Sequence, residues 1–104
     1  ERINLHEYVR SDFLMHGNMQ SLVTILFEKT HLDTVAQRFG VNEARYSNVD
    51  SLHFTVDTNV EINSTFYNWL LGFGTDAKIL KPEWAAEAFL KHIDKIKNAY
   101  NEKQ

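Results

Sequence analysis

Four stretches of the chain have the hydrophobic pattern of β-strands. Residues 20–28 carry apolar side chains on both alternating sets of positions, which predicts a buried strand. Apolar and polar residues alternate over residues 52–57, as in an antiparallel strand with one solvated face. A weaker pattern bordered by turn residues predicts a short edge strand at Ala44–Tyr46. We expect the last short strand at Ala77–Leu80.

The first two helices are predicted from apolar residues at helical spacing between these strands. The first begins at Thr30, which we expect to act as its N-cap. It ends before Gly40, because glycine is favoured just past a helix C-terminus. The second begins at Asn63 or Ser64, either of which can cap it. Its apolar stripe continues to Phe73.

The last predicted helix begins at Pro82, whose missing N–H costs nothing at a first helical position, and continues to Tyr100. Glu87 and Lys91 are four residues apart on it, which predicts a favourable pair on the solvated side. The full order of elements is β-α-β-β-α-β-α. This order predicts an α+β fold, a ferredoxin-like β-α-β-β-α-β sandwich with an additional C-terminal helix.

The length of 104 residues fits one domain. Residues 1–18 lack a firm period, so we expect a linker or arm from a missing N-terminal part, with the ferredoxin-like domain over residues 19–104. The chain has no cysteine, which excludes a disulfide scaffold, a thiolate zinc site and a cysteine nucleophile. This composition is typical of the reducing cytoplasm, where we expect the protein. The apolar stretches are too short to span a bilayer.

The charge of the chain argues against direct binding to duplex DNA. Lys and Arg number 11 and Asp and Glu 14, a formal net charge of -3, whereas duplex binding depends mainly on neutralising phosphates. The lysines of the last helix alternate with acidic residues, as on a solvated helix face. We therefore expect no duplex binding by this domain.

The sequence contains no pattern of catalytic or metal-binding residues. No two histidines are two, three or four residues apart, and a zinc site normally includes such a local pair. No nucleophile elbow, P-loop or dinucleotide-binding motif occurs. We predict no catalytic residue, no metal and no cofactor, and a protein that is not an enzyme. The histidines, expected at the surface or half-buried, are His6, His16, His31, His53 and His92.

Aromatic residues of the last two predicted helices have two interpretations. They can stack on nucleic-acid bases, but their helical spacing favours a place in the core. We expect Trp69 to be a core anchor and Tyr67 to be the most exposed of the set. The set comprises Phe66, Tyr67, Trp69, Phe73 and Trp84.

Several segments of the chain form an ordered set of motifs. They are Phe13-Leu14-Met15, Arg38-Phe39-Gly40, Trp69-Leu70-Leu71-Gly72-Phe73-Gly74, Ala77-Lys78-Ile79-Leu80-Lys81-Pro82 and the helix ending at Tyr100. This set resembles the end of WYL-domain transcriptional regulators. In that family a tryptophan-led helix, a turn with phenylalanine and glycine, a short strand ending in proline and a closing helix form the C-terminal extension. The resemblance covers most of residues 5–101, and the order and spacing of its motifs carry it.

The resemblance implies that the intact protein carries an N-terminal winged helix-turn-helix and a central WYL barrel, both missing here. Residues 1–3 would then be the tail of the linker that leaves the barrel. This domain would be the regulatory C-terminal extension, responsible for assembly and effector response, with a nucleotide or nucleic-acid fragment as candidate effector. The alternative is a free-standing ferredoxin-like enzyme or small-molecule-binding module, because many functions share this topology.

A sheet covered by helices on one side leaves its other face open. Strand alternation directs Phe54 and Val56 to the helices, so the opposite face receives three leucines among seven positions. Contiguous exposed apolar residues usually mark interaction sites. We predict that this face contacts a second copy or the missing barrel, and that no membrane is involved. The alternative is that residues 1–18 or the last helix cover this face, because both carry apolar residues of their own. The predicted contact residues are Leu22, Thr24, Leu26, His53, Thr55, Lys78 and Leu80.

Overall fold

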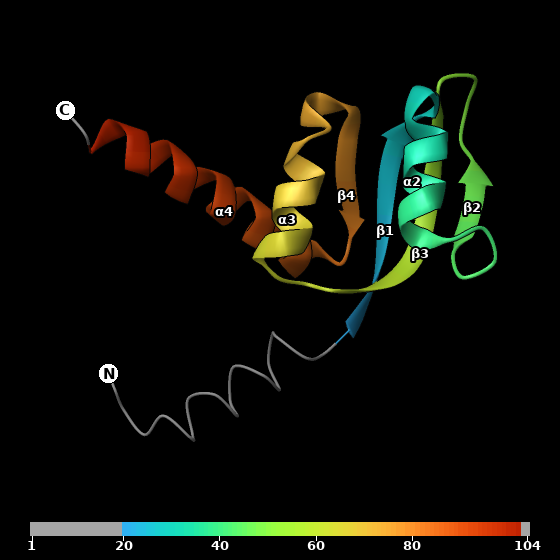
Figure 1. The fold of residues 1–104 in the computed structure, drawn as a ribbon, viewed down its shortest axis with the longest axis horizontal. Helices are drawn as coiled ribbons and strands as arrows, with labels where there is room; N and C mark the ends of the chain where they lie inside the picture. Colours follow the sequence, from blue (N-terminus) through green and yellow to red (C-terminus); the bar gives the residue numbers. More distant parts are fainter. Residues whose placement is uncertain (1–19, 103–104) are drawn as a thin grey trace.

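Four antiparallel strands form one sheet in the computed structural model, which describes residues 20–102. The spatial order is β2-β3-β1-β4, with β1 paired to β3 on one side and to β4 on the other (Figure 1). This order fits the predicted ferredoxin-like arrangement and confirms the α+β fold. The predicted arm, residues 1–18, lies outside the described residues. The strands are β1 (Gln20–Glu28), β2 (Arg45–Asn48), β3 (His53–Glu61) and β4 (Ala77–Lys81).

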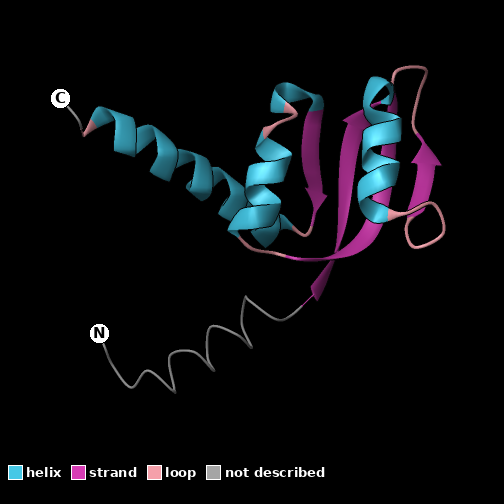
Figure 2. Cartoon of the chain, viewed as in Figure 1, coloured by secondary structure: helices cyan, strands magenta, loops and turns pink. Residues whose placement is uncertain are grey.

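Two helices cover one face of this sheet, and a third leaves its edge (Figure 2). They are α2 (Leu32–Phe39), α3 (Ser64–Leu71) and α4 (Glu83–Asn101). The first part of α4 packs on β4 and α3, and its C-terminal part extends away from the sheet (Figure 1). The order of elements along the described residues is therefore the predicted β-α-β-β-α-β-α.

Local signals positioned most helix ends correctly. The Asn63 side chain accepts a hydrogen bond of 2.9 Å from the Phe66 N–H, which confirms Asn63 as the N-cap of α3. Gly40 follows α2 with a φ of 90°, a left-handed conformation that glycine adopts without steric cost. The prediction for Thr30 was wrong, because this residue lies in a 3₁₀ turn before α2 and makes no capping bond.

Other predicted boundaries shifted by one to four residues. The edge strand begins at Arg45, not at Ala44, and continues to Asn48. The central strand β3 extends to Glu61 because it pairs with all of β1, which alternation over six residues did not show. Pro82 is the residue before α4, not its first helical residue.

The core lies between the sheet and the helices. Phe27 and Phe66 are its largest fully buried side chains, and the Phe27 ring stacks on Phe54 with centroids 5.7 Å apart. Full burial of such a side chain stabilises the fold by about 1.5–3 kcal/mol. The core residues are Val23, Ile25, Phe27, Val35, Phe39, Phe54, Val56, Val60, Ile62, Phe66, Tyr67, Leu70, Ile79 and Ala85.

Two aromatic predictions failed in the same region. Tyr67 is buried, with 6% of its surface exposed, because its ring packs on Phe89 of α4 with centroids 5.5 Å apart. Trp84, expected in the core, is 48% exposed. Phe73 lies beyond the end of α3, yet its ring still packs on Trp69, with the ring centroids 4.8 Å apart. The packing of α4 on α3 thus reversed the predicted exposure of the two residues.

Candidate interaction surface

The seven predicted contact residues all belong to the face of the sheet opposite the helices, here called the open face. Their neighbours Val23, Ile25 and Phe27 are fully buried on the helix side, and side chains alternate between the two faces of a strand. The prediction of one continuous buried strand at 20–28 was therefore wrong for its outward residues, since Leu22 is 62% exposed. Whether the open face is a contact surface stays a prediction.

Strand register determines which of these residues are neighbours. Leu26, near the C-terminal end of β1, lies opposite Thr55 of β3 and Lys78 of β4. Leu22 lies opposite Asn59, outside the predicted set. Residues directly opposite each other in a sheet are in side-chain contact range. Leu26 is therefore a half-buried leucine between a threonine and a lysine on the open face.

A β-bulge alters the edge of the open face at β4. Thr24 pairs with Lys81, whereas the next residue, Ile25, pairs with Ile79. Leu80 is thus the extra residue of the bulge, and 42% of its surface is exposed. Bulges bend a strand and redirect side chains. Leu80 therefore adds an apolar side chain at this edge of the face.

Asp57 and Arg45 are charged residues of the open face that lie outside the predicted contact set. The Thr24 hydroxyl donates a hydrogen bond of 2.6 Å to the carboxylate of Asp57, and Arg45 of β2 lies opposite Asp57 in the register. A hydroxyl bound to a carboxylate makes a charge-assisted bond, which is stronger than a neutral one. Alternation already placed Asp57 on this side. Arg45 lies within the predicted edge strand, but only its register opposite Asp57 assigns it to this face.

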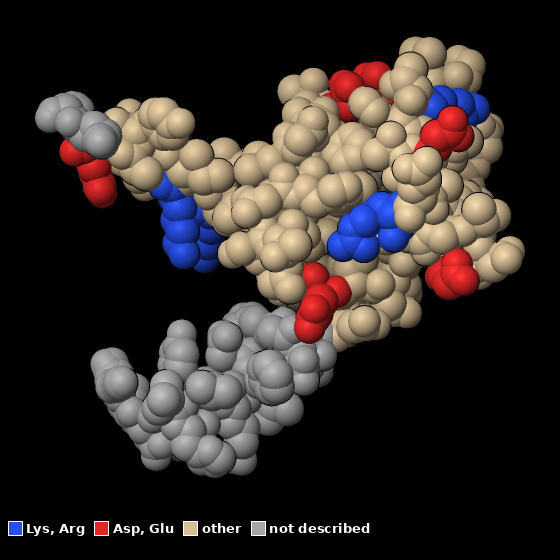
Figure 3. Space-filling view, in the orientation of Figure 1, with Lys and Arg blue, Asp and Glu red and all other residues tan. Residues whose placement is uncertain are grey.

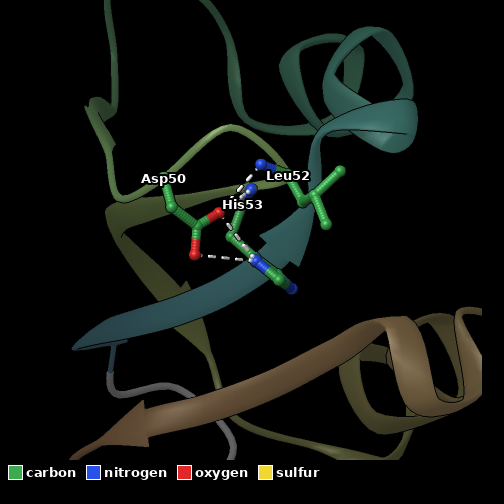
Figure 4. A network of polar contacts seen from close by, with 3 residues as sticks. All are labelled: Asp50, Leu52 and His53. Atoms are coloured by element: carbon green, nitrogen blue, oxygen red, sulfur yellow. Dashed lines mark hydrogen bonds and ion pairs between the residues drawn. The ribbon is translucent and has the colours of Figure 1, made fainter.

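His53 is held at the end of the open face by an aspartate in the β2–β3 turn (Figure 4). One carboxylate oxygen of Asp50 accepts hydrogen bonds of 2.8 Å from the backbone N–H groups of Leu52 and His53. The same oxygen lies 2.9 Å from Nδ1 of the His53 ring. The hydrogen bond from the Leu52 N–H, followed by the one with the His53 ring, lowers the pKa of Asp50 below its usual value. His53 is therefore oriented by the turn.

Neither a cluster of potential metal ligands nor a bilayer-spanning helix occurs among the described residues. Residues 20–102 contain no group of three potential metal ligands from histidine, cysteine, aspartate and glutamate. None of the helices in this part of the chain is both long enough and apolar enough to cross a bilayer.

One comparison with known proteins identifies a family. The family model described as WCX domain matches residues 21–96, which is most of the chain and includes all four strands. The searches of curated proteins and of solved structures gave no significant match.

Proposed function

The chain belongs to the WCX domain family, the C-terminal extension domain of WYL-domain transcriptional regulators, and we propose that it is the regulatory domain of a cytoplasmic DNA-binding regulator. The family match carries the proposal. In this role the domain does no chemistry itself. It supports assembly of the regulator and its response to an effector, for which a nucleotide or a nucleic-acid fragment is the candidate.

The open face is the surface that we propose for this assembly, either with a second copy or with the WYL barrel. Two of its leucines, Leu22 and Leu80, are well exposed in the described residues although they lie in strands. Polar groups such as the hydrogen-bonded Thr24 and Asp57 lie among them. Protein interfaces combine apolar contacts with satisfied polar groups in this way.

Regulation follows from a population shift. If one packing of the domain on its partner is compatible with DNA binding, an effector that favours this packing raises the DNA-competent population. The shift is limited by the difference between the effector's affinities for the two states. In this proposal the domain acts through its contacts, so substitutions of open-face residues are the test of it.

The experiment measures self-association of the 104-residue chain by light scattering over a range of concentrations. Leu22→Glu is the main variant, because Leu22 is exposed and its replacement should leave the fold intact. Leu26→Glu is the second variant and changes the half-buried leucine between Thr55 and Lys78. A matched control is Leu90→Glu, since Leu90 is 59% exposed on α4, away from the sheet.

We expect the parent and the Leu90 variant to associate, and the two open-face variants to be monomers with unchanged circular dichroism. Association of the Leu22 variant at the parent's concentration would refute the contact between copies. A parent that stays monomeric at high concentration would also refute it and would leave docking on the barrel. Unfolding of the Leu26 variant alone would show that this position is buried too deeply to report on contacts.

A further inference from the structure

A pocket with an unusual lining lies between the start of α3 and the first half of α4. Its volume is about 460 Å³, within the range of roughly 300–1,000 Å³ that small-molecule sites occupy. The lining combines apolar, aromatic and cationic side chains. It consists of Ile62, Asn63, Ser64, Tyr67, Trp84, Ala88, Lys91, His92 and Lys95.

The charge of this pocket is positive, although the chain has a net charge of -3. Lys91 and Lys95 line it, and no carboxylate does. Two other pockets of the described surface each include a carboxylate, Glu61 in one and Glu43 with Asp57 in the other. The positive lining is therefore a local property of this pocket.

Both lysines are available to a ligand. The salt bridges of residues 20–102 involve histidines only, so the predicted ion pair between Glu87 and Lys91 is not formed. Residues four apart lie on the same side of a helix, which brings the ammonium groups of Lys91 and Lys95 to one wall of the pocket. Figure 3 shows basic side chains along the middle of α4, with acidic ones at its C-terminal end.

The rest of the lining is suited to a planar ring. Trp84 presents a half-exposed indole, and indole faces stack on planar groups and cations. The buried ring of Tyr67 and the methyl group of Ala88 supply further apolar surface. His92 is oriented by a contact of 2.8 Å between its Nε2 and the side-chain oxygen of Asn68. The apolar and cationic parts therefore adjoin within one pocket.

We propose that this pocket binds a small molecule that combines a planar ring with a phosphate or carboxylate group. The ring stacks on Trp84, and the anionic group is bound by Lys91 and Lys95. Ammonium groups form charge-assisted hydrogen bonds with such oxyanions. Ser64, at the start of α3, also lines the pocket, and its hydroxyl is a further hydrogen-bond donor. This binding does not depend on the proposed contact of the open face, because no open-face residue lines the pocket.

The probe is phenyl phosphate, titrated into the ¹⁵N-labelled 104-residue chain and followed by two-dimensional NMR. The chain has only two tryptophans, so the indole N–H signal of Trp84 is identified by comparison with Trp84→Phe. We expect saturable shifts of the Trp84 indole and of the Lys91 and Lys95 amides. Inorganic phosphate at the same concentration should shift the lysine amides weakly and leave the indole in place.

Two double variants separate the pocket from overall charge. Lys91→Gln with Lys95→Gln should weaken phenyl phosphate binding by about tenfold or more, since a hydrogen bond to a charged group contributes at least this factor. Lys29→Gln with Lys97→Gln removes the same charge from exposed positions outside the pocket and outside the open face. This variant should leave the affinity within about twofold of the parent. Unchanged amide signals in the core of each variant would verify the fold.

Three results would overturn the proposal. They are the absence of any saturable shift, equal weakening by the two double variants, and saturation of the lysine amides without a shift of the Trp84 indole. A failure of the Leu22 and Leu26 variants to alter association would bear only on the open face.

Discussion

Truncation of Trp69 tests how the aromatic residues stabilise this fold. The indole is half-buried against the core. Its centroid lies 4.8 Å from that of the Phe73 ring and 5.3 Å from that of the Phe39 ring. The guanidinium of Arg38 lies over it at 5.4 Å. Trp69→Ala therefore removes contacts to α2, to the end of α3 and, through Phe27 at 6.2 Å, to the central strand.

The expected loss of stability follows from this burial. Truncation of a buried large aromatic to alanine costs about 3–5 kcal/mol, and the partial exposure of Trp69 places it at the lower end, at about 3 kcal/mol. For a domain of this length, such a loss lowers Tm by roughly 12–24 °C. The free energy of unfolding is measured by urea titration with far-ultraviolet circular dichroism, because the substitution alters tryptophan fluorescence.

Trp84→Ala is the matched control, since it removes the same atoms from a position that is 48% exposed. We expect its free energy of unfolding to remain within about 1 kcal/mol of the parent. Equal losses in the two variants, or a loss below about 1 kcal/mol for Trp69→Ala, would refute the conclusion that Trp69 anchors the core.

Three further predictions concern a helix cap, a titrating turn and nucleic acid. Asn63→Ala should destabilise the domain by about 1 kcal/mol, the usual value of an N-cap, whereas Asn42→Ala at an exposed position should have no measurable effect in the same urea titration. The pKa of Asp50 is lowered, first by the Leu52 N–H and then by His53, so its carboxylate stabilises the fold above its ordinary pKa, and this contribution is lost as the pH falls through the folded value. Asp50→Asn should therefore be less stable than the parent at pH 7 and equal to it near pH 2 in thermal melts. Fluorescence anisotropy should show no salt-dependent micromolar binding of duplex DNA at physiological ionic strength, since the net charge is -3.

Each of these three predictions can fail in its own way. If Asn63→Ala causes no loss in the free energy of unfolding, water replaces the 2.9 Å hydrogen bond between the Phe66 N–H and Asn63. A stability difference for Asp50→Asn that persists at pH 2 would show a packing effect instead of an electrostatic one. Duplex binding that weakens as salt rises would reveal a basic surface that the net charge conceals.

The sequence alone determined the elements and their order. Alternation predicted which residues of β1 and β3 point to the helices, and Asn63 and Gly40 indicated a helix start and a helix end. Such signals are local, because a cap or a strand period depends on residues within a few positions of one another. Given the β-α-β-β-α-β order, few topologies are compatible with short, right-handed connections, so the ferredoxin-like arrangement was also predictable.

The exposure of individual side chains was decided by the tertiary structure. Helical spacing placed Tyr67 and Trp84 in one aromatic set, but α4 covers Tyr67 through Phe89 and turns Trp84 outward. The same packing creates the pocket beside Lys91 and Lys95. Periodicity defines which residues of a helix share a face, whereas burial depends on which distant element packs on that face, and this requires the three-dimensional path of the chain.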